Sequence, residues 1–249
     1  MARPVHLITL SIAAAATVAP VASAAVPRND QWSYRILSAK GTITFTASGE
    51  WFDGFSRDFD DNALNTKGSI TIVNTWRMAR PRAQTLVLGQ ILKNPRGRYP
   101  LPLRGIAGTS TVNGSGTTGD GKPLTCTATV PLARGFFSDS AVNDMFLHFR
   151  GRGRSVNPFV RGGYPTYPTG ESTVSPDCGS LITGLGLRDV DEKRPTLIKA
   201  AFFRRKPGTV ISFVVTHSMP VRATKISGEP ITGSVTWRST FTMRLLSAL

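Results

Sequence analysis

The last part of the chain alternates between apolar and polar residues over an unusually long stretch. The mainly apolar series takes every second position and comprises Ile231, Gly233, Val235, Trp237, Ser239, Phe241, Met243 and Leu245. Since strand side chains project alternately to two faces, we predict that Trp237, Phe241 and Met243 are buried. On the other face, Arg238, Thr240 and Arg244 should be exposed. Strands usually have about 3–10 residues, so we expect a bend or bulge near Ser239, or a passage between sheets.

The same alternation recurs in earlier segments, whereas sustained helical periodicity is nearly absent. Segments 32–36 and 43–47 predict two strands of a hairpin that turns at Ala39–Gly41, and Ser69–Trp76 and Ile211–Val215 predict two more strands. Clusters of Gly, Pro, Asn and Ser separate these runs. The candidates for short helices are Ser138–Phe146 and Leu187–Lys193. We therefore predict an all-β fold, a single antiparallel sandwich or barrel-like domain of about 8–12 strands.

The first 24 residues have the pattern of a secretory signal peptide. A polar start precedes the apolar run Leu7–Val21, and Ala22-Ser23-Ala24 provides small residues for cleavage. Later apolar runs fall short of the roughly 20 residues of a membrane-spanning helix. We predict a signal peptide over residues 1–24, one domain over 25–249, no membrane span in the mature chain, and export to the cell envelope or beyond.

The predicted export bears on the oxidation state of the two cysteines of the chain, Cys126 and Cys178. In an oxidising compartment an isolated pair favours a disulfide over two free thiols. Cys126 lies in an alternating, strand-like run, and Cys178 lies in a segment rich in Pro and Gly. The predicted bond would tie down the loop-like region around residues 150–180.

Nucleophile, phosphate-loop and zinc motifs are absent from the sequence. Downstream of the predicted signal peptide the chain has two histidines, His148 and His217. His217 continues the apolar register of Ile211–Val215, which indicates a core or sheet-edge position. We predict no catalytic residues, no cofactor and no metal.

Acidic residues concentrate in one segment, where they alternate with aromatic residues. Its members are Glu50, Asp53, Asp58, Asp60 and Asp61. A calcium loop is disfavoured because Ala63 stands where the loop needs Gly and Ser69 where it needs Glu. The remaining interpretations are a solvated acidic loop, a glycan or cation loop formed by Glu50, Asp53, Asp58 and Asp60, and the carboxylate pair of a polysaccharide hydrolase.

The basic residues point to a partner. The chain has 30 Lys and Arg against 15 Asp and Glu, a formal charge of +15. Arg150, Arg152 and Arg154 share a parity and alternate with glycines, which we interpret as leaving the backbone open to a ligand, and Arg161 follows. Arginine suits phosphate, sulfate and carboxylate groups. We predict a non-enzymatic binding or structural module that binds anionic polymers or cell-envelope glycans through these four arginines. The alternatives are the hydrolase and an outer-membrane barrel with arginines lining its lumen.

Overall fold

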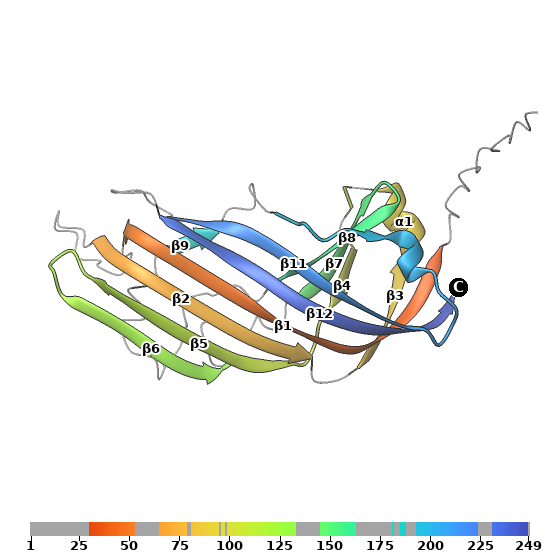
Figure 1. Ribbon diagram of the computed structural model, residues 1–249, viewed down its shortest axis with the longest axis horizontal. Helices are drawn as coiled ribbons and strands as arrows, with labels where there is room; N and C mark the ends of the chain where they lie inside the picture. The colour runs from red at the N-terminus through yellow and green to blue at the C-terminus, as the bar shows by residue number, and fades with distance from the viewer. Residues whose placement is uncertain are drawn as a thin grey trace, which may run out of the picture.

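The fold is all-β and consists of two antiparallel sheets (Figure 1). The computed structural model describes residues 30–52, 65–78, 81–94, 96–97, 99–132, 145–162, 181, 185–187, 193–223 and 231–248. In spatial order, the larger sheet contains β6 (Pro123–Pro131), β5 (Ile106–Thr117), β2 (Asn65–Met78), β1 (Gln31–Phe52), β12 (Thr232–Ala248), β11 (Val210–Ala223) and β9 (Leu185–Leu187), with β3 (Arg82–Val87) also paired to β1. The smaller sheet contains β10 (Ile198–Lys199), β8 (Ser155–Arg161), β7 (Phe146–Arg152) and β4 (Tyr99–Pro102).

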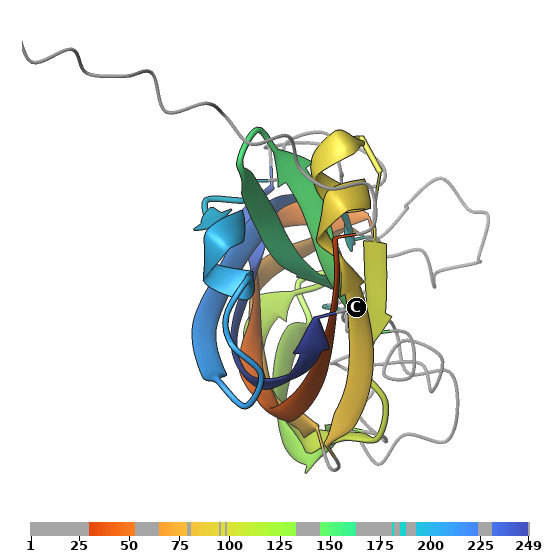
Figure 2. The same cartoon turned by 90° about the vertical axis from the view of Figure 1, so that its right-hand side faces the viewer.

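The smaller sheet lies toward one end of the larger one. Figure 2 shows the larger sheet curving around the core, with β7, β8 and the helix α1 (Leu88–Lys93) at one end. Cross-strand aromatic contacts join the sheets: the Phe159 ring lies 6.0 Å from that of His217, and His217 stacks on Trp237 at 4.1 Å. The Trp237 Nε1 group donates a hydrogen bond to the Gly162 carbonyl oxygen at 3.1 Å. His217 is thus a core residue, as its apolar register indicates.

The structure confirms the predicted buried and exposed faces of β12. Trp237, Phe241 and Met243 are at most 1% exposed, whereas Arg238 and Arg244 are exposed and Thr240 is half-buried. The predicted irregularity at Ser239 is wrong, because this residue pairs in regular register with Gly41 on one side and Val215 on the other. β12 therefore stays within one sheet.

The pairing of β1 with β12 has two register shifts, between Ser33 and Tyr34 and between Ile36 and Ser38. The second one corrects the prediction of a hairpin at Ala39–Gly41. Residues 31–52 form one strand, in which Leu37 is skipped by the register with β12. Before Leu37, Tyr34 and Ile36 face the core, and after it Ile43 and Phe45 do. A bulge residue changes the parity of the inward positions. The switch from even to odd inward positions therefore marks a bulge rather than a turn.

The short helices expected from the sequence lie mostly outside the described residues. Phe146 begins β7 and Leu187 ends β9, while residues 138–144 and 188–192 lie outside the described residues. The helical elements whose bounds lie within the described residues are α1 and the 3-10 turn η3 (Ala200–Phe203). α1 packs on β7. At six residues it is too short to give the periodicity from which a helix is predicted.

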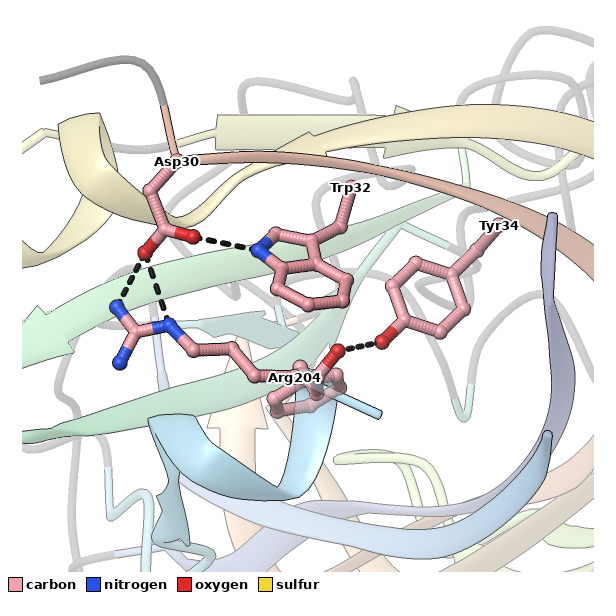
Figure 3. A network of polar contacts seen from close by, with 5 residues as sticks. Asp30, Trp32, Tyr34 and Arg204 are labelled. Carbon is pink, nitrogen blue, oxygen red and sulfur yellow. Dashed lines mark hydrogen bonds and ion pairs between the residues drawn. The ribbon is translucent and has the colours of Figure 1, made fainter. Parts of the chain in front are cut away.

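A polar network fastens the start of β1 to the end of η3 (Figure 3). The buried Asp30 carboxylate accepts a hydrogen bond from Trp32 Nε1, and its Oδ2 atom accepts one from Arg204 Nε at 2.9 Å. The Tyr34 hydroxyl donates to the Phe203 carbonyl oxygen. Burial raises the pKa of the Tyr34 phenol well above its ordinary value, and the charge of Arg205 opposes this rise only in part. The network joins segments that are far apart in the sequence.

One member of the predicted disulfide can be placed. Cys126 lies on β6 with its side chain fully buried, and no described cysteine is a free thiol. Cys178 lies outside the described residues, as does the predicted signal peptide, so the Cys126–Cys178 pairing and the peptide stay predictions. Among the described residues, none of the helices has the length and apolar character needed to cross a membrane.

Candidate functional site

The outer face of the larger sheet carries a groove with a volume of about 760 Å³. It crosses β12, β1, β2 and β5, and three cationic side chains, Lys40, Arg77 and Arg238, line it. None of the described residues that line it is acidic. We call these three side chains and the threonines between them the basic groove.

The strand register brings the three cations of the basic groove together. Lys40 on β1 stands directly opposite Arg77 on β2. On the other side of β1, Arg238 stands opposite Thr42, so it is a diagonal neighbour of Lys40. Directly opposite Cβ atoms in antiparallel sheets are about 4.5–5.5 Å apart, and diagonal neighbours about 7–8 Å. One anionic group can therefore be reached by all three flexible side chains.

Threonines form the neutral part of the basic groove. Thr42 lies between Arg238 and Thr75 in the register. The Thr75 and Thr109 hydroxyls share a hydrogen bond of 2.8 Å across β2 and β5. Such cross-strand pairs are the arrangement expected for threonines on a solvated sheet face. Their hydroxyls give the groove donors and acceptors next to its cations.

Two glycines let the strands approach one another beneath the groove. Gly41 and Gly108 flank the buried Trp76 in one row across the sheet. A Cβ atom would lie 2.5 Å from the Arg238 carbonyl oxygen at Gly41, and 1.8 Å from that of Thr75 at Gly108. Real Cβ atoms do not approach backbone so closely, so both positions require glycine. The two glycines therefore allow the close strand spacing beneath the cationic side chains of the groove.

A second like-charge pair lies farther along the same face. Arg35 on β1 is directly opposite Arg244 on β12, and both are exposed. Lys40 follows Arg35 by five residues, which corresponds to about 16 Å along a strand. Of the four side chains in these two pairs, Arg35, Arg244, Lys40 and Arg77, none forms an ion pair with a described acidic residue. Like charges placed directly opposite each other destabilise a sheet, and here two such pairs are present.

The arginines expected to bind anions are only partly together. Arg152 and Arg154 are exposed at the tip of the β7–β8 hairpin, beside Gly153 with a φ of 62°. Arg150 is half-buried on β7. Arg161 is opposite Phe146 at the other end of the hairpin, six residues or about 20 Å from Ser155, the register partner of Arg152. The sheet thus separates Arg161 from the arginines at the tip.

The glycine between two of these arginines has a packing role. Gly151 is buried, and a Cβ atom there would lie 2.0 Å from the carbonyl oxygen of Ile91 in α1. The expectation that this glycine leaves the backbone open to a ligand is therefore wrong. Its missing side chain is the space into which α1 packs.

The acidic segment can be placed at one position. Glu50 is half-buried on β1, opposite Lys67 of β2. Asp53, Asp58 and Asp60 lie outside the described residues. Within the described part of the chain, no three His, Cys, Asp or Glu side chains form a group that could hold a metal ion. His148 stacks on Phe159 with ring centroids 5.1 Å apart, so both histidines take part in aromatic packing.

The basic groove was missed by sequence reasoning, although a signal for it is present. The tripeptide Thr-Trp-Arg occurs twice, at 75–77 and 236–238. In both copies the tryptophan is buried and the arginine exposed. A repeat of this kind on two strands that flank a third would place two arginines on one face. The register that makes β2 and β12 the neighbours of β1 is not visible in the sequence.

Comparisons with known proteins leave the family open. No family model matches the chain, and no curated protein sequence matches it. Among solved structures, an acetoacetate decarboxylase-like enzyme from Sphingomonas wittichii RW1 aligns with 96% of this chain and 100% of its own. The two are 9% identical, and the TM-score of 0.17 is too low to carry an argument about fold or function.

Proposed function

We propose that the protein is an exported binding protein whose basic groove binds the anionic groups of a polymer. The observation that carries this proposal is the Lys40–Arg77 pair, two cations in direct cross-strand register with no described acid beside them. Such a pair costs folding free energy in the absence of an anion. A bound phosphate, sulfate or carboxylate would remove that repulsion and engage both side chains.

A polymer fits the site better than a single small anion. The Arg35–Arg244 pair and the basic groove lie on one face, about 16 Å apart along β1. A ligand with repeated negative charges can contact both, whereas a single small anion can contact only one. Anionic glycans and polymers of the cell envelope have this repeated charge, and an exported protein would meet them. The hydrolase alternative stays a prediction, because Asp53, Asp58 and Asp60 lie outside the described residues.

The test compares two variants that lose the same charge. The groove variant is Lys40→Gln, Arg77→Gln, Arg238→Gln. The control is Arg152→Gln, Arg154→Gln, Lys199→Gln, which removes three exposed cations near the β7–β8 tip, where Lys199 pairs with Ser155. Affinity for fluorescent polyphosphate and for dextran sulfate is measured at several salt concentrations, with uncharged dextran as the negative probe.

The parent should bind both anionic polymers with an affinity that falls steeply with salt. Each phosphate contact contributes roughly 0.7–0.9 to the log–log salt slope of nucleic acids. The groove variant should therefore lose about 2–3 from this slope and the control variant much less. Equal losses would mean that a diffuse positive field does the binding, and a larger loss in the control would assign the site to the hairpin. A parent that does not bind at about 50 mM salt would exclude this class of partner.

A further inference from the structure

The inner face of the larger sheet contains a cluster of buried polar side chains without partners. Asn74, Trp76, Ser110 and Ser239 are each at most 2% exposed. Both polar atoms of the Asn74 amide, the Trp76 Nε1 group and the two serine hydroxyls lack a hydrogen-bond partner in the structure. None of these atoms is in contact with solvent. We call these four side chains the inner polar stripe.

The register places the inner polar stripe on two adjacent rows of the sheet. Asn74 on β2 is directly opposite Ser110 on β5. Trp76 follows Asn74 on the same face and lies two strands away from Ser239, with Gly41 of β1 between them. The rows span four neighbouring strands, about 14 Å at the usual strand spacing. The four side chains therefore lie in neighbouring positions on one face of the sheet.

Gly41 separates Trp76 from Ser239 in the second of these rows. A Cβ atom on Gly41 would lie 2.7 Å from the Ser239 hydroxyl oxygen, so this hydroxyl lies over a position that has no side chain. The Trp76 ring leans toward β12, where its centroid is 6.3 Å from that of Phe241. Trp76 and Ser239 thus flank a position in the row that has no side chain.

Folded proteins almost always give buried polar atoms a partner, either protein or bound water. Four such side chains in one stripe therefore point to a guest that supplies the missing hydrogen bonds. Trp76 can only donate, Asn74 can donate and accept, and serine can do either. A hydroxyl group, which both donates and accepts, matches this set. No member of the stripe is charged, so a neutral guest is favoured over an ion.

We infer that the inner polar stripe binds neutral hydroxyl groups inside the core. Their source is either a short row of internal water molecules or a small hydroxylated ligand. This inference is independent of the proposed function, because it concerns the opposite face of the sheet.

The first test uses stability. If the stripe holds a guest, Ser110→Ala and Ser239→Ala each remove a hydrogen bond, and each should lower Tm by about 2–4 °C for a domain of this size. If the stripe is empty, each change removes an unsatisfied polar atom, and Tm should stay the same or rise. Ser115→Ala is the matched control, because Ser115 is an exposed serine on the same strand, β5. An unchanged or higher Tm in both buried variants would overturn the inference.

The second test identifies the guest. The Trp76 indole N–H resonance is assigned by its loss in Trp76→Phe, and its cross-relaxation to water or to ligand protons is measured by NMR. Solvent extraction of the purified protein followed by mass spectrometry then separates the sources. A cross-peak to long-lived water with an empty extract identifies internal water, and a stoichiometric neutral hydroxylated compound identifies a ligand. An indole N–H that shows neither contact overturns the inference.

Discussion

The β7–β8 hairpin and the basic groove are both rich in cations, but their cations are brought together in opposite ways. The arginines of the hairpin are close in the sequence, and the turn at Gly153 leaves Arg152 and Arg154 at its tip while Arg161 lies at the other end. Lys40, Arg77 and Arg238 are far apart in the sequence and adjacent in the sheet. Closeness along the chain is therefore a poor guide to a shared binding surface in an antiparallel sheet.

The glycines of the two regions make room for different parts of the structure. Gly151 makes room for α1 against the smaller sheet, whereas Gly41 and Gly108 make room for neighbouring strands beneath the groove. Neither region uses these glycines to expose backbone to a ligand. In the proposed function the anion is therefore recognised by charged side chains and not by exposed backbone, and the following changes test that proposal in order of decreasing effect.

The largest effect should separate the two faces of β12 at adjacent residues. Trp237→Ala removes a fully buried side chain and should lower the free energy of unfolding by about 3–5 kcal/mol. Arg238→Ala, on the exposed face, should change it by less than about 0.5 kcal/mol while weakening anion binding. Urea unfolding measures both. Similar losses from the two changes would show that Arg238 supports the fold and is not a groove residue.

The next effect concerns the hairpin glycines. Gly151→Ala should lower the free energy of unfolding by about 3 kcal/mol, the upper part of the range for overpacking, because the clash is with backbone. Gly153→Ala meets no atom within 4 Å but keeps a positive φ, so its cost should be about 1 kcal/mol. Thermal and urea unfolding of the two variants measure which of them loses more stability. If Gly151→Ala left stability intact and instead blocked polyanion binding, this glycine would belong to a ligand site.

Sequence reasoning succeeded where the deciding pattern is local. The alternation around Trp237, in β2 and in β11 reports directly which side chains face the core, so the all-β fold and the faces of three strands were predictable. It failed at β1, where the bulge at Leu37 shifts the parity and Ala39-Lys40-Gly41 resembles a turn. Gly41 is present because β12 approaches it closely, a tertiary cause that no local pattern records.

The candidate site was less predictable than the fold for the same reason. The net charge indicates an anionic partner, but the grouping of Lys40, Arg77 and Arg238 depends on which strands pair and in which register. The hairpin arginines were predicted to form the anion-binding site because they are close together in the sequence. Two long-range pairings, β1 with β2 and β1 with β12, decide the location of the groove.

A smaller effect is expected in the network that fastens β1 to η3. Tyr34→Phe removes the hydrogen bond to the Phe203 carbonyl and should cost about 1 kcal/mol near pH 7. Because burial raises the pKa of the folded phenol above the ordinary tyrosine pKa of about 10, the contribution of its hydrogen bond is fully present below about pH 10. It declines above pH 10, where the unfolded chain loses the phenol proton that the folded chain keeps.

The gap in stability between parent and Tyr34→Phe should therefore narrow as the pH rises above about 10, the unfolded pKa, and change sign by about pH 11 to 12. The Tm values of the parent and of Tyr34→Phe, measured across this pH range, test the prediction. Tyr99→Phe is the control for the loss of a tyrosine hydrogen bond to a backbone carbonyl, since its hydroxyl donates to Gln90 at 3.0 Å. A gap that stays constant across this range would argue against a buried, protonated Tyr34.

The smallest effect tests the repulsion on which the groove proposal rests. Lys40→Gln removes one charge of the Lys40–Arg77 pair, so it should raise the free energy of unfolding by a few tenths of a kcal/mol, the scale of about 0.2–1 kcal/mol for cross-strand pairs. The gain should be present at about 0.01 M salt, where the screening length is about 30 Å, and vanish at about 1 M, where it is about 3 Å. Arg152→Gln at the hairpin tip should show no comparable gain.

Adding polyphosphate should reverse this order, because a ligand that binds the folded state stabilises it in proportion to its affinity. The parent should then gain more stability than Lys40→Gln, and the variant that was slightly more stable alone should become the less stable of the two. This reversal requires that Lys40 both repels Arg77 and contacts the anion. A Lys40→Gln protein that is less stable than the parent at low salt, without any polymer, would show that the lysine is held by an attractive contact and that the pair is not an anion site.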